Sequence, residues 1–128
     1  MYLLDTCTLI WLSSDLSKLP KKIIDLVEGI PEQLFASSIS AFEIGIKSGK
    51  KQLILPCDAK VWYEELLVHL QVQDLPVDAA IAMQSTQLKN IHTDPCDRII
   101  VATAMLHDMT ILSPDPLIKK FPDIKILW

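Results

Sequence analysis

Four acidic side chains occupy similar places in the sequence, each at the junction between a short apolar segment and a helical one. They are Asp5, Glu43, Asp97 and Asp115. Carboxylates that gather on one edge of a sheet repel one another and raise their own pKa values. A cation placed among them removes that penalty, so this pattern points to a metal site.

The type of ligand limits the type of metal. Carboxylate oxygens suit Mg²⁺ or Mn²⁺, whereas zinc prefers histidine and cysteine, and neither residue is expected at these junctions. Mg²⁺ held by a few carboxylates is a common arrangement for phosphate-ester chemistry. The sequence therefore predicts a Mg²⁺ or Mn²⁺ site that acts on a phosphate ester.

Helix starts also attract acids for structural reasons. Asp94 fits an N-cap, with Pro95 at the first helical position and Asp97 in the first turn, where a carboxylate complements the helix dipole. Glu43 follows Ser40 by three residues, which is the spacing of a capping box in the first turn of a helix. Each acid taken singly has such an explanation, and only the four together favour a metal.

The elements that must position these acids alternate along the chain. Short apolar segments separated by helices of roughly ten residues are typical of an α/β fold with a central parallel sheet and helices on both faces. In such a sheet the sites form at the edge where the strands end. The expected strands are 2–4, 34–37, 71–75, 109–112 and 124–127, and the expected helices are 6–12, 21–28, 38–47, 58–70, 76–88, 94–105 and a short one after 115.

Composition restricts the class of protein. The 128 residues suit one domain, 1–128, and half of them are hydrophobic, which is atypical of a disordered chain. No apolar run is long enough to span a bilayer, and the amino terminus has no basic region of the secretory type, so we expect a cytoplasmic protein. The net charge of −4 argues against a general nucleic-acid binder. Three widely spaced cysteines, expected to be reduced and half-buried, are Cys7, Cys57 and Cys96.

Four stretches of the chain together resemble a known family. They are Asp5-Thr6 after an apolar strand, Ser40-Ala41-Phe42-Glu43-Ile44, the segment from Asp94 to Ala104, and Ser113-Pro114-Asp115. In this order and spacing the chain resembles the PIN domain, and more narrowly the VapC-type ribonuclease toxins of type II toxin–antitoxin systems. The segment that begins at Asp94 is the most specific, although Cys96 stands where related sequences usually have an aromatic or bulky residue.

The resemblance implies a PIN-like three-layer α/β/α fold and a Mg²⁺-dependent endoribonuclease that hydrolyses RNA phosphodiester bonds. The acidic quartet of the family falls on the four residues already named, and the hydroxyls of Thr6 and Ser113 lie beside the first and last of them. The family also implies a homodimer and a cognate antitoxin that binds a hydrophobic groove, for which the surfaces near Trp11 and helix 58–70 are candidates. A small upstream reading frame that begins with a DNA-binding segment is expected to encode that antitoxin.

Several alternatives stay open at this stage. Asp5 is also the expected nucleophile of an α/β phosphohydrolase or phospho-acceptor domain, although Cys7 stands where haloacid-dehalogenase-type phosphatases have a second Asp. A third possibility is a domain that kept the fold only for binding. Arg98 fits either a contact with phosphate or, as we expect, an ion pair with an acid such as Asp94.

Other residues have two readings as well. Lys47, Lys50 and Lys51 suit either the RNA backbone or a helix carboxyl end. No histidine is assigned to catalysis. The large aromatic residues Trp11, Trp62, Tyr63 and Trp128 are expected in the core or at an interface.

Overall fold

A five-stranded parallel sheet runs through the chain, in the order β3-β2-β1-β4-β5. The structure is a computed structural model that describes all residues from 1 to 128. Every connection returns the chain to the same end of the sheet, so all strands finish at one edge. The strands are β1 (Tyr2–Leu4), β2 (Leu34–Ser37), β3 (Gln73–Leu75), β4 (Thr110–Leu112) and β5 (Lys125–Leu127).

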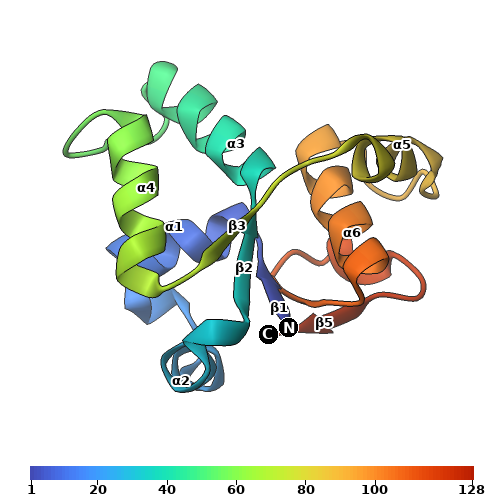
Figure 1. Cartoon of the computed structure of the whole chain (residues 1–128), viewed down its shortest axis with the longest axis horizontal. Helices are drawn as coiled ribbons and strands as arrows, with labels where there is room; N and C mark the ends of the chain where they lie inside the picture. The colour runs from blue at the N-terminus through green and yellow to red at the C-terminus, as the bar shows by residue number, and fades with distance from the viewer.

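Six α-helices cover the two faces of this sheet. In Figure 1 the helices α1 to α4 lie on one side of the strands, and α5 and α6 lie on the other. None of the helices combines the length and hydropathy that crossing a membrane requires. The helices are α1 (Thr6–Ser14), α2 (Lys21–Gly29), α3 (Ser38–Gly49), α4 (Ala59–Leu70), α5 (Ala79–Gln87) and α6 (Pro95–His107), and three short 3₁₀ segments lie at Leu16–Lys18, Pro31–Gln33 and Ile118–Lys120.

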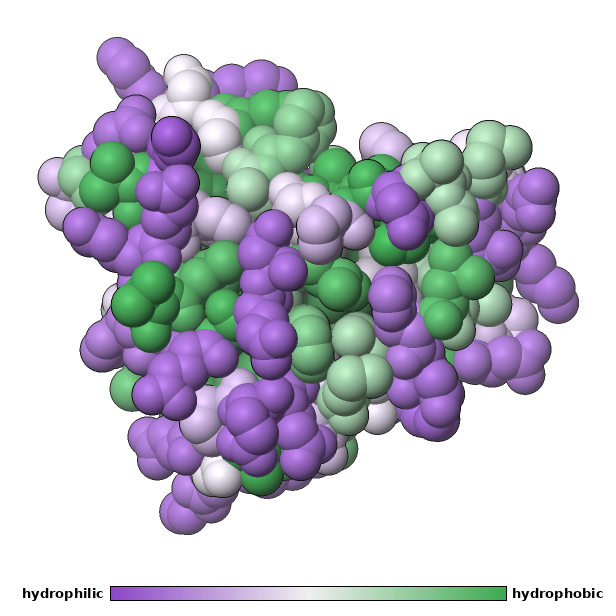
Figure 2. Space-filling view, in the orientation of Figure 1, coloured by the Kyte–Doolittle hydropathy of each residue, from purple (hydrophilic) through white to green (hydrophobic).

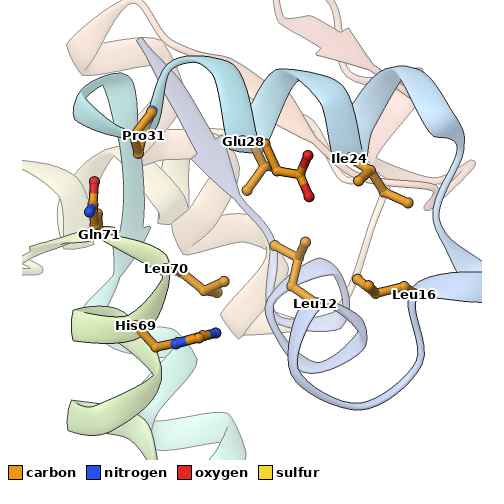
Figure 3. Close-up of a pocket in the computed structure, with 9 residues that line it drawn as sticks. Leu12, Leu16, Ile24, Glu28, Pro31, His69, Leu70 and Gln71 are labelled. Carbon is orange, nitrogen blue, oxygen red and sulfur yellow. The ribbon is translucent and has the colours of Figure 1, made fainter.

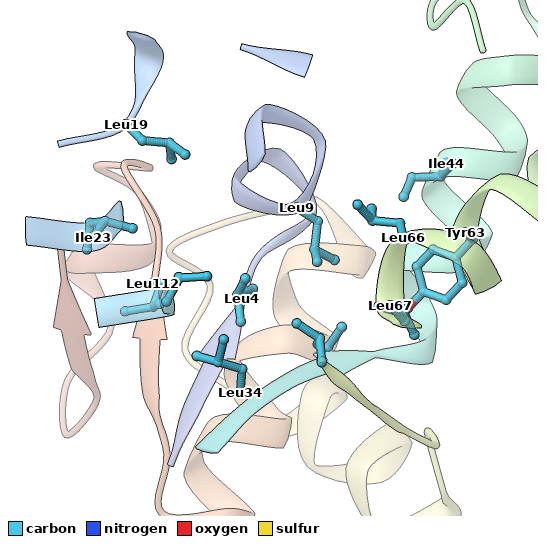
Figure 4. Packing of buried hydrophobic residues seen from close by; sticks show 13 residues of the cluster. Leu4, Leu9, Leu19, Ile23, Leu34, Ile44, Tyr63, Leu66, Leu67 and Leu112 are labelled. Atoms are coloured by element: carbon cyan, nitrogen blue, oxygen red, sulfur yellow. The ribbon is translucent and has the colours of Figure 1, made fainter. Parts of the chain in front are cut away.

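Neighbouring strand residues belong to two separate hydrophobic clusters, because successive side chains of a strand point to opposite faces of the sheet. Leu4 and Leu112 pack with residues of α1 to α4, as Figure 4 shows for the larger cluster. Leu3 and Ile111 pack on the other face with Ile100 and its neighbours from α6. All five side chains are fully buried. The sheet is therefore apolar on both faces, and this explains why its strands read as continuous apolar runs.

The expected α/β class with a central parallel sheet and helices on both faces is confirmed. The aromatic residues also lie where we expected, since Tyr63 is buried in the larger cluster and the three tryptophans pack against it. Trp11 and Trp128 meet each other with ring centroids 5.9 Å apart. Cys7 and Cys96 are half-buried as expected, whereas Cys57 is exposed, so the expectation for that residue is wrong.

Some element boundaries differ from the prediction. The helix expected from residue 76 begins at Ala79, because Asp78 caps it by accepting a hydrogen bond from the Ile81 amide. The strand expected from residue 71 begins at Gln73, because Gln71 takes the left-handed conformation that ends α4. The helix expected after Asp115 is only the 3₁₀ turn Ile118–Lys120.

The capping box expected at Ser40 and Glu43 is wrong. The strand β2 runs to Ser37, and the Ser37 hydroxyl caps α3 by accepting a hydrogen bond from the Ile39 amide. Glu43 therefore lies in the second turn of α3, and the Ser40 side chain is free for another contact. The acidic side chain projects from within the helix rather than from its start.

Candidate metal centre

One open cavity of about 370 Å³ lies at the edge where the strands end, beside the central strand β1. The sheet order changes direction at β1, and such a position is where α/β sheets form their binding sites. The structure brings all four predicted acids to this cavity, together with Asp94 and the ammonium of Lys47. Five carboxylates and one lysine thus line the cavity, which is otherwise formed by Thr6, Cys7, Pro114 and Pro116.

Asp5 is fixed where β1 ends and α1 begins. It is the N-cap of α1, and one of its carboxylate oxygens accepts a hydrogen bond from the Thr8 amide at 2.8 Å. The Thr8 hydroxyl donates to the Leu112 carbonyl at 3.0 Å, which ties the start of α1 to the end of β4. The structural role that we weighed for Asp5 is therefore real, and it leaves the carboxylate at the cavity.

Ser113 connects the first and last acids of the quartet. Its hydroxyl oxygen accepts a hydrogen bond from the Asp115 amide at 3.1 Å, and its hydroxyl group hydrogen-bonds to Asp5. Ser113 is 1% exposed, so water does not compete for these bonds. The turn that presents Asp115 is thereby attached to the carboxylate at the end of β1.

A chain of two hydroxyls orients Glu43. Thr6 donates to a carboxylate oxygen of Glu43 at 2.7 Å, and its oxygen lies 2.9 Å from that of Ser40. A hydroxyl has one hydrogen to give, so Ser40 must be the donor to Thr6. Ser40 and Thr6 are both buried, and together they aim Glu43 at the cavity. The sequence analysis assigned Ser40 to a cap and missed this role.

Three carboxyl groups of the cavity have raised pKa values, so their charged forms are disfavoured. Burial raises the pKa of Asp5 and of Glu43, although hydrogen bonds from Ser113 and Thr6 act in the opposite direction. The pKa of Asp97 is raised to about 7, first by burial and then by repulsion from Asp94 and Glu43. The cavity therefore concentrates more negative charge than its own cations neutralise.

His92 also lies at this site, which the sequence analysis did not predict. Its Nε2 is 2.9 Å from Asp97 Oδ2 and 3.2 Å from Asp115 Oδ2. The expectation that neither histidine nor cysteine stands at these junctions is therefore wrong, since Cys7 also lines the cavity. A signal was present in the sequence, since His92 is two residues before the N-cap of α6, and the loop before a helix reaches the same edge as its first turn.

Arg98 has neither of the roles that we considered for it. Its guanidinium donates to four backbone carbonyls at 2.8–3.1 Å, and it forms no ion pair with Asp94 or another acid. These carbonyls belong to the end of α5 and to the loop that follows, where a helix leaves its last carbonyls without partners. Arg98 therefore fixes this loop against α6.

The donor set fits a divalent cation such as Mg²⁺. Carboxylate oxygens are its preferred protein ligands, and several of them lie here beside an open cavity that leaves room for the waters Mg²⁺ retains. Burial and, to a lesser extent, neighbouring acids raise the pKa of Asp5, Glu43 and Asp97, and a bound cation would offset this cost. A carboxylate oxygen of Asp97 and one of Asp115 lie within 4.8 Å of each other, close enough to share one ion.

Comparison with known families gives a match over nearly the whole chain. Residues 2–124 match the model of the PIN domain. The chain belongs to the PIN domain family. PIN domains are nucleases that use divalent metal ions, in agreement with the acidic cavity of this one. A search among curated proteins found no match.

Solved structures with the same fold come from toxin–antitoxin complexes. The DNA-bound VapBC of Salmonella typhimurium superposes on this PIN domain with a TM-score of 0.76, at 21% identity, covering 98% of this chain and 96% of that one. The FitAcB complex of Neisseria gonorrhoeae has a TM-score of 0.69 at 23% identity, covering 100% of this chain and 97% of that one. VapBC2 of Rickettsia felis, bound to a promoter fragment, has a TM-score of 0.71 at 16% identity, covering 98% of this chain and 96% of that one. At these identities the similarity establishes the shared fold.

The raised pKa of Asp97 predicts an unusual pH dependence of stability. Without metal, the folded state keeps a proton on Asp97 up to about pH 7, whereas the unfolded chain releases it near 4. The folded state then binds more protons, so the contribution of Asp97 to stability falls as the pH rises from 4 to 7. In EDTA at pH 8 Asp97 is charged, and Asp97→Asn removes this charge, so the free energy of unfolding should rise. Because water screens part of the repulsion, the rise should be only about 1–2 kcal/mol.

Thermal or denaturant unfolding measures this effect, and the same experiment at pH 5 is the control, because Asp97 is then protonated and the substitution should change little. Mg²⁺ should stabilise the unsubstituted protein at pH 8 and less so at pH 5. A loss of stability in Asp97→Asn at pH 8 in EDTA would contradict the argument.

Proposed function

We propose that this PIN domain is a Mg²⁺-dependent endoribonuclease, with Mn²⁺ as a possible substitute, and the toxin component of a type II toxin–antitoxin system. The observation that carries the proposal is the convergence of Asp5, Glu43, Asp97 and Asp115 on one cavity from four separate segments of the chain. The similarity to toxin–antitoxin complexes supports the toxin assignment. A cytoplasmic location, where RNA and an antitoxin are available, belongs to the same proposal.

The residues of the cavity divide the work of hydrolysis. A divalent cation would supply Lewis-acid stabilisation of the phosphate and would activate water. Asp5, Glu43 and Asp97 would hold the cation, and Asp115 would complete the same set or serve a second ion. A carboxylate oxygen that is not engaged by the metal would accept the proton of the attacking water.

RNA would approach along α3. Lys47 lines the cavity, and Lys50 and Lys51 are exposed where this helix ends. These three ammonium groups contact phosphates of the RNA backbone in the proposal, and they provide local positive charge that the chain lacks as a whole. Their removal should weaken RNA binding and reduce its dependence on salt.

RNA cleavage with Mg²⁺ tests the proposal. Asp5→Asn and Asp97→Asn should each lower the cleavage rate by about 100-fold or more, because each removes a carboxylate that holds the metal which stabilises the transition state. EDTA should abolish cleavage, and Mn²⁺ should restore it. The control is Asp25→Asn, which changes an exposed acid paired with Lys21 on α2 and should leave the rate unchanged. Full activity in both cavity variants would refute the assignment.

A hydrophobic groove offers a surface for the antitoxin. A cavity of about 350 Å³ lies between α1, α2 and α4, with Leu12, Ile24 and Leu70 pointing into it in Figure 3. Both surfaces that we named from the sequence border this groove, since Leu12 follows Trp11 and Leu70 ends α4. VapB and FitA are partners in the similar structures, and the proposal assigns this groove to the corresponding partner of the present chain.

Substitution in the groove should separate toxin from antitoxin. Leu16 lines the groove and is 51% exposed, so Leu16→Glu should leave the fold intact. Co-expression with the product of the adjacent small reading frame measures binding by co-purification. The substitution should weaken binding at least about tenfold through lost apolar burial. Met105→Glu on α6 is the control, and equal co-purification of both variants would move the antitoxin site elsewhere.

A homodimer is the other assembly that the proposal includes. Large apolar side chains are exposed on α3 and α5, among them Phe42 at 57% and Met83 at 60%. Figure 2 shows hydrophobic surface over α5 between hydrophilic flanks. Light scattering at micromolar concentration should give twice the mass of one chain for the unsubstituted protein. The Phe42→Glu variant should give the mass of a single chain. Ile54→Glu, in the loop after α3, is the control, and a monomeric unsubstituted protein would contradict the dimer.

The alternative of an α/β phosphohydrolase or phospho-acceptor domain with Asp5 as the nucleophile has less support. Asp5 is 4% exposed and is already held by the Thr8 amide. A nucleophile would also leave the convergence of the other acids without a purpose.

A further inference from the structure

A histidine between two carboxylates is the feature of the cavity that the proposed chemistry does not use. His92 comes from the loop after α5, Asp97 from the first turn of α6 and Asp115 from the turn after β4. The His92 side chain is 11% exposed and contacts both acids, with a hydrogen bond to Asp115. No other side chain forms an ion pair or hydrogen bond with the Asp97 carboxylate.

The other ring nitrogen of His92 identifies its tautomer. Nδ1 accepts a hydrogen bond from the Asp94 amide at 3.3 Å, so it carries no hydrogen. In the neutral ring the hydrogen is then on Nε2, which faces the two carboxylates. A nitrogen that carries a hydrogen has no lone pair for a metal. His92 is therefore a hydrogen-bond donor to Asp115, with Nε2 also 2.9 Å from Asp97 Oδ2, and it is not a ligand.

The backbone around His92 is held firmly. The guanidinium of Arg98 donates to the His92 carbonyl at 3.1 Å and to the carbonyls of Leu88 and Lys89 at 2.8 and 3.0 Å. Since Arg98 is the residue after Asp97 on α6, the same helix turn carries the acid and the anchor of the loop. The imidazole thus has a fixed place relative to Asp97.

We infer that His92 is a positioning residue that spans Asp97 and Asp115 and holds the two carboxylates at the separation that a divalent cation needs. The inference rests on the metal site of the proposed function. Partners that hydrogen-bond to metal ligands commonly contribute 10–100-fold to metal affinity, because they remove rotamers that the metal would otherwise have to select against. Arg98 and the Asp94 amide hold His92 in turn.

Calorimetry with Mg²⁺ and Mn²⁺ on the purified full chain, without RNA, measures this contribution. His92→Ala should weaken the affinity for both ions about tenfold. His92→Gln and His92→Asn form a matched pair, because the Gln amide nitrogen reaches the position of Nε2 and the Asn amide only that of Nδ1. Gln should restore most of the affinity, and Asn should not. His107→Ala, an exposed histidine at the end of α6, should behave as the unsubstituted protein.

A spectroscopic measurement on the metal-free protein is independent of binding. The ¹⁵N shifts of the His92 ring should show hydrogen on Nε2 and none on Nδ1, both before and after Mg²⁺ is added. Unchanged affinity in His92→Ala, or equal affinities of the Gln and Asn variants, would overturn the inference. The inference would also be overturned if the Nε2 hydrogen were lost when metal is added and if His92→Ala weakened Mn²⁺ binding more than Mg²⁺ binding. His92 would then be a metal ligand.

The outcomes also separate this inference from the proposed function. RNA cleavage with unchanged metal affinity in His92→Ala would leave the function standing and remove the role of His92. Metal affinity that depends on His92, without cleavage of any RNA, would remove the ribonuclease assignment and retain the positioning role.

Discussion

Repulsion between carboxylates is the constraint on which the rest of this site depends. Asp5, Glu43 and Asp97 are buried enough that their pKa values rise, and each is close enough to other acids to raise them further. A fold gains nothing in stability from such an arrangement. The arrangement is useful only to a protein that binds positive charge at this point, and the cavity beside β1 has the oxygen ligands for it.

Neutral donors hold the acids in place against this repulsion. Ser113 connects the ends of β1 and β4, and the Ser40 and Thr6 hydroxyls orient Glu43. Backbone amides donate hydrogen bonds to the carboxylates of Asp5 and Asp115. A hydroxyl or an amide fixes a carboxylate without neutralising it, whereas a lysine or arginine would compete with the metal. Arg98 illustrates this difference, because its guanidinium donates hydrogen bonds to backbone carbonyls and forms none with the acids.

The two hydrophobic clusters explain why the site is at the edge and the groove is elsewhere. Packing on both faces of the sheet leaves only the strand ends open to solvent, and the first four helices leave a second hollow where α1, α2 and α4 diverge. Polar side chains from loops and helix starts lie at the end of the sheet, and the hollow is lined partly by apolar side chains that belong to the larger cluster or pack against it. The acidic cavity and the groove therefore lie on separate surfaces with different chemistry.

The sequence by itself determined the fold class, the number of strands and their places along the chain, and four of the acids that reach the common edge. Those features follow from local patterns: apolar runs of strand length, helical periodicity, and Asp94-Pro95 at a helix start. The tertiary structure decided what depends on contacts between distant segments. Ser40 meets Thr6 across 34 residues and His92 meets Asp115 across 23, and no periodicity encodes such pairs. The charge of Arg98 predicted an ion pair, but the open carbonyls at the end of α5 became its partners only when α5 and α6 packed together.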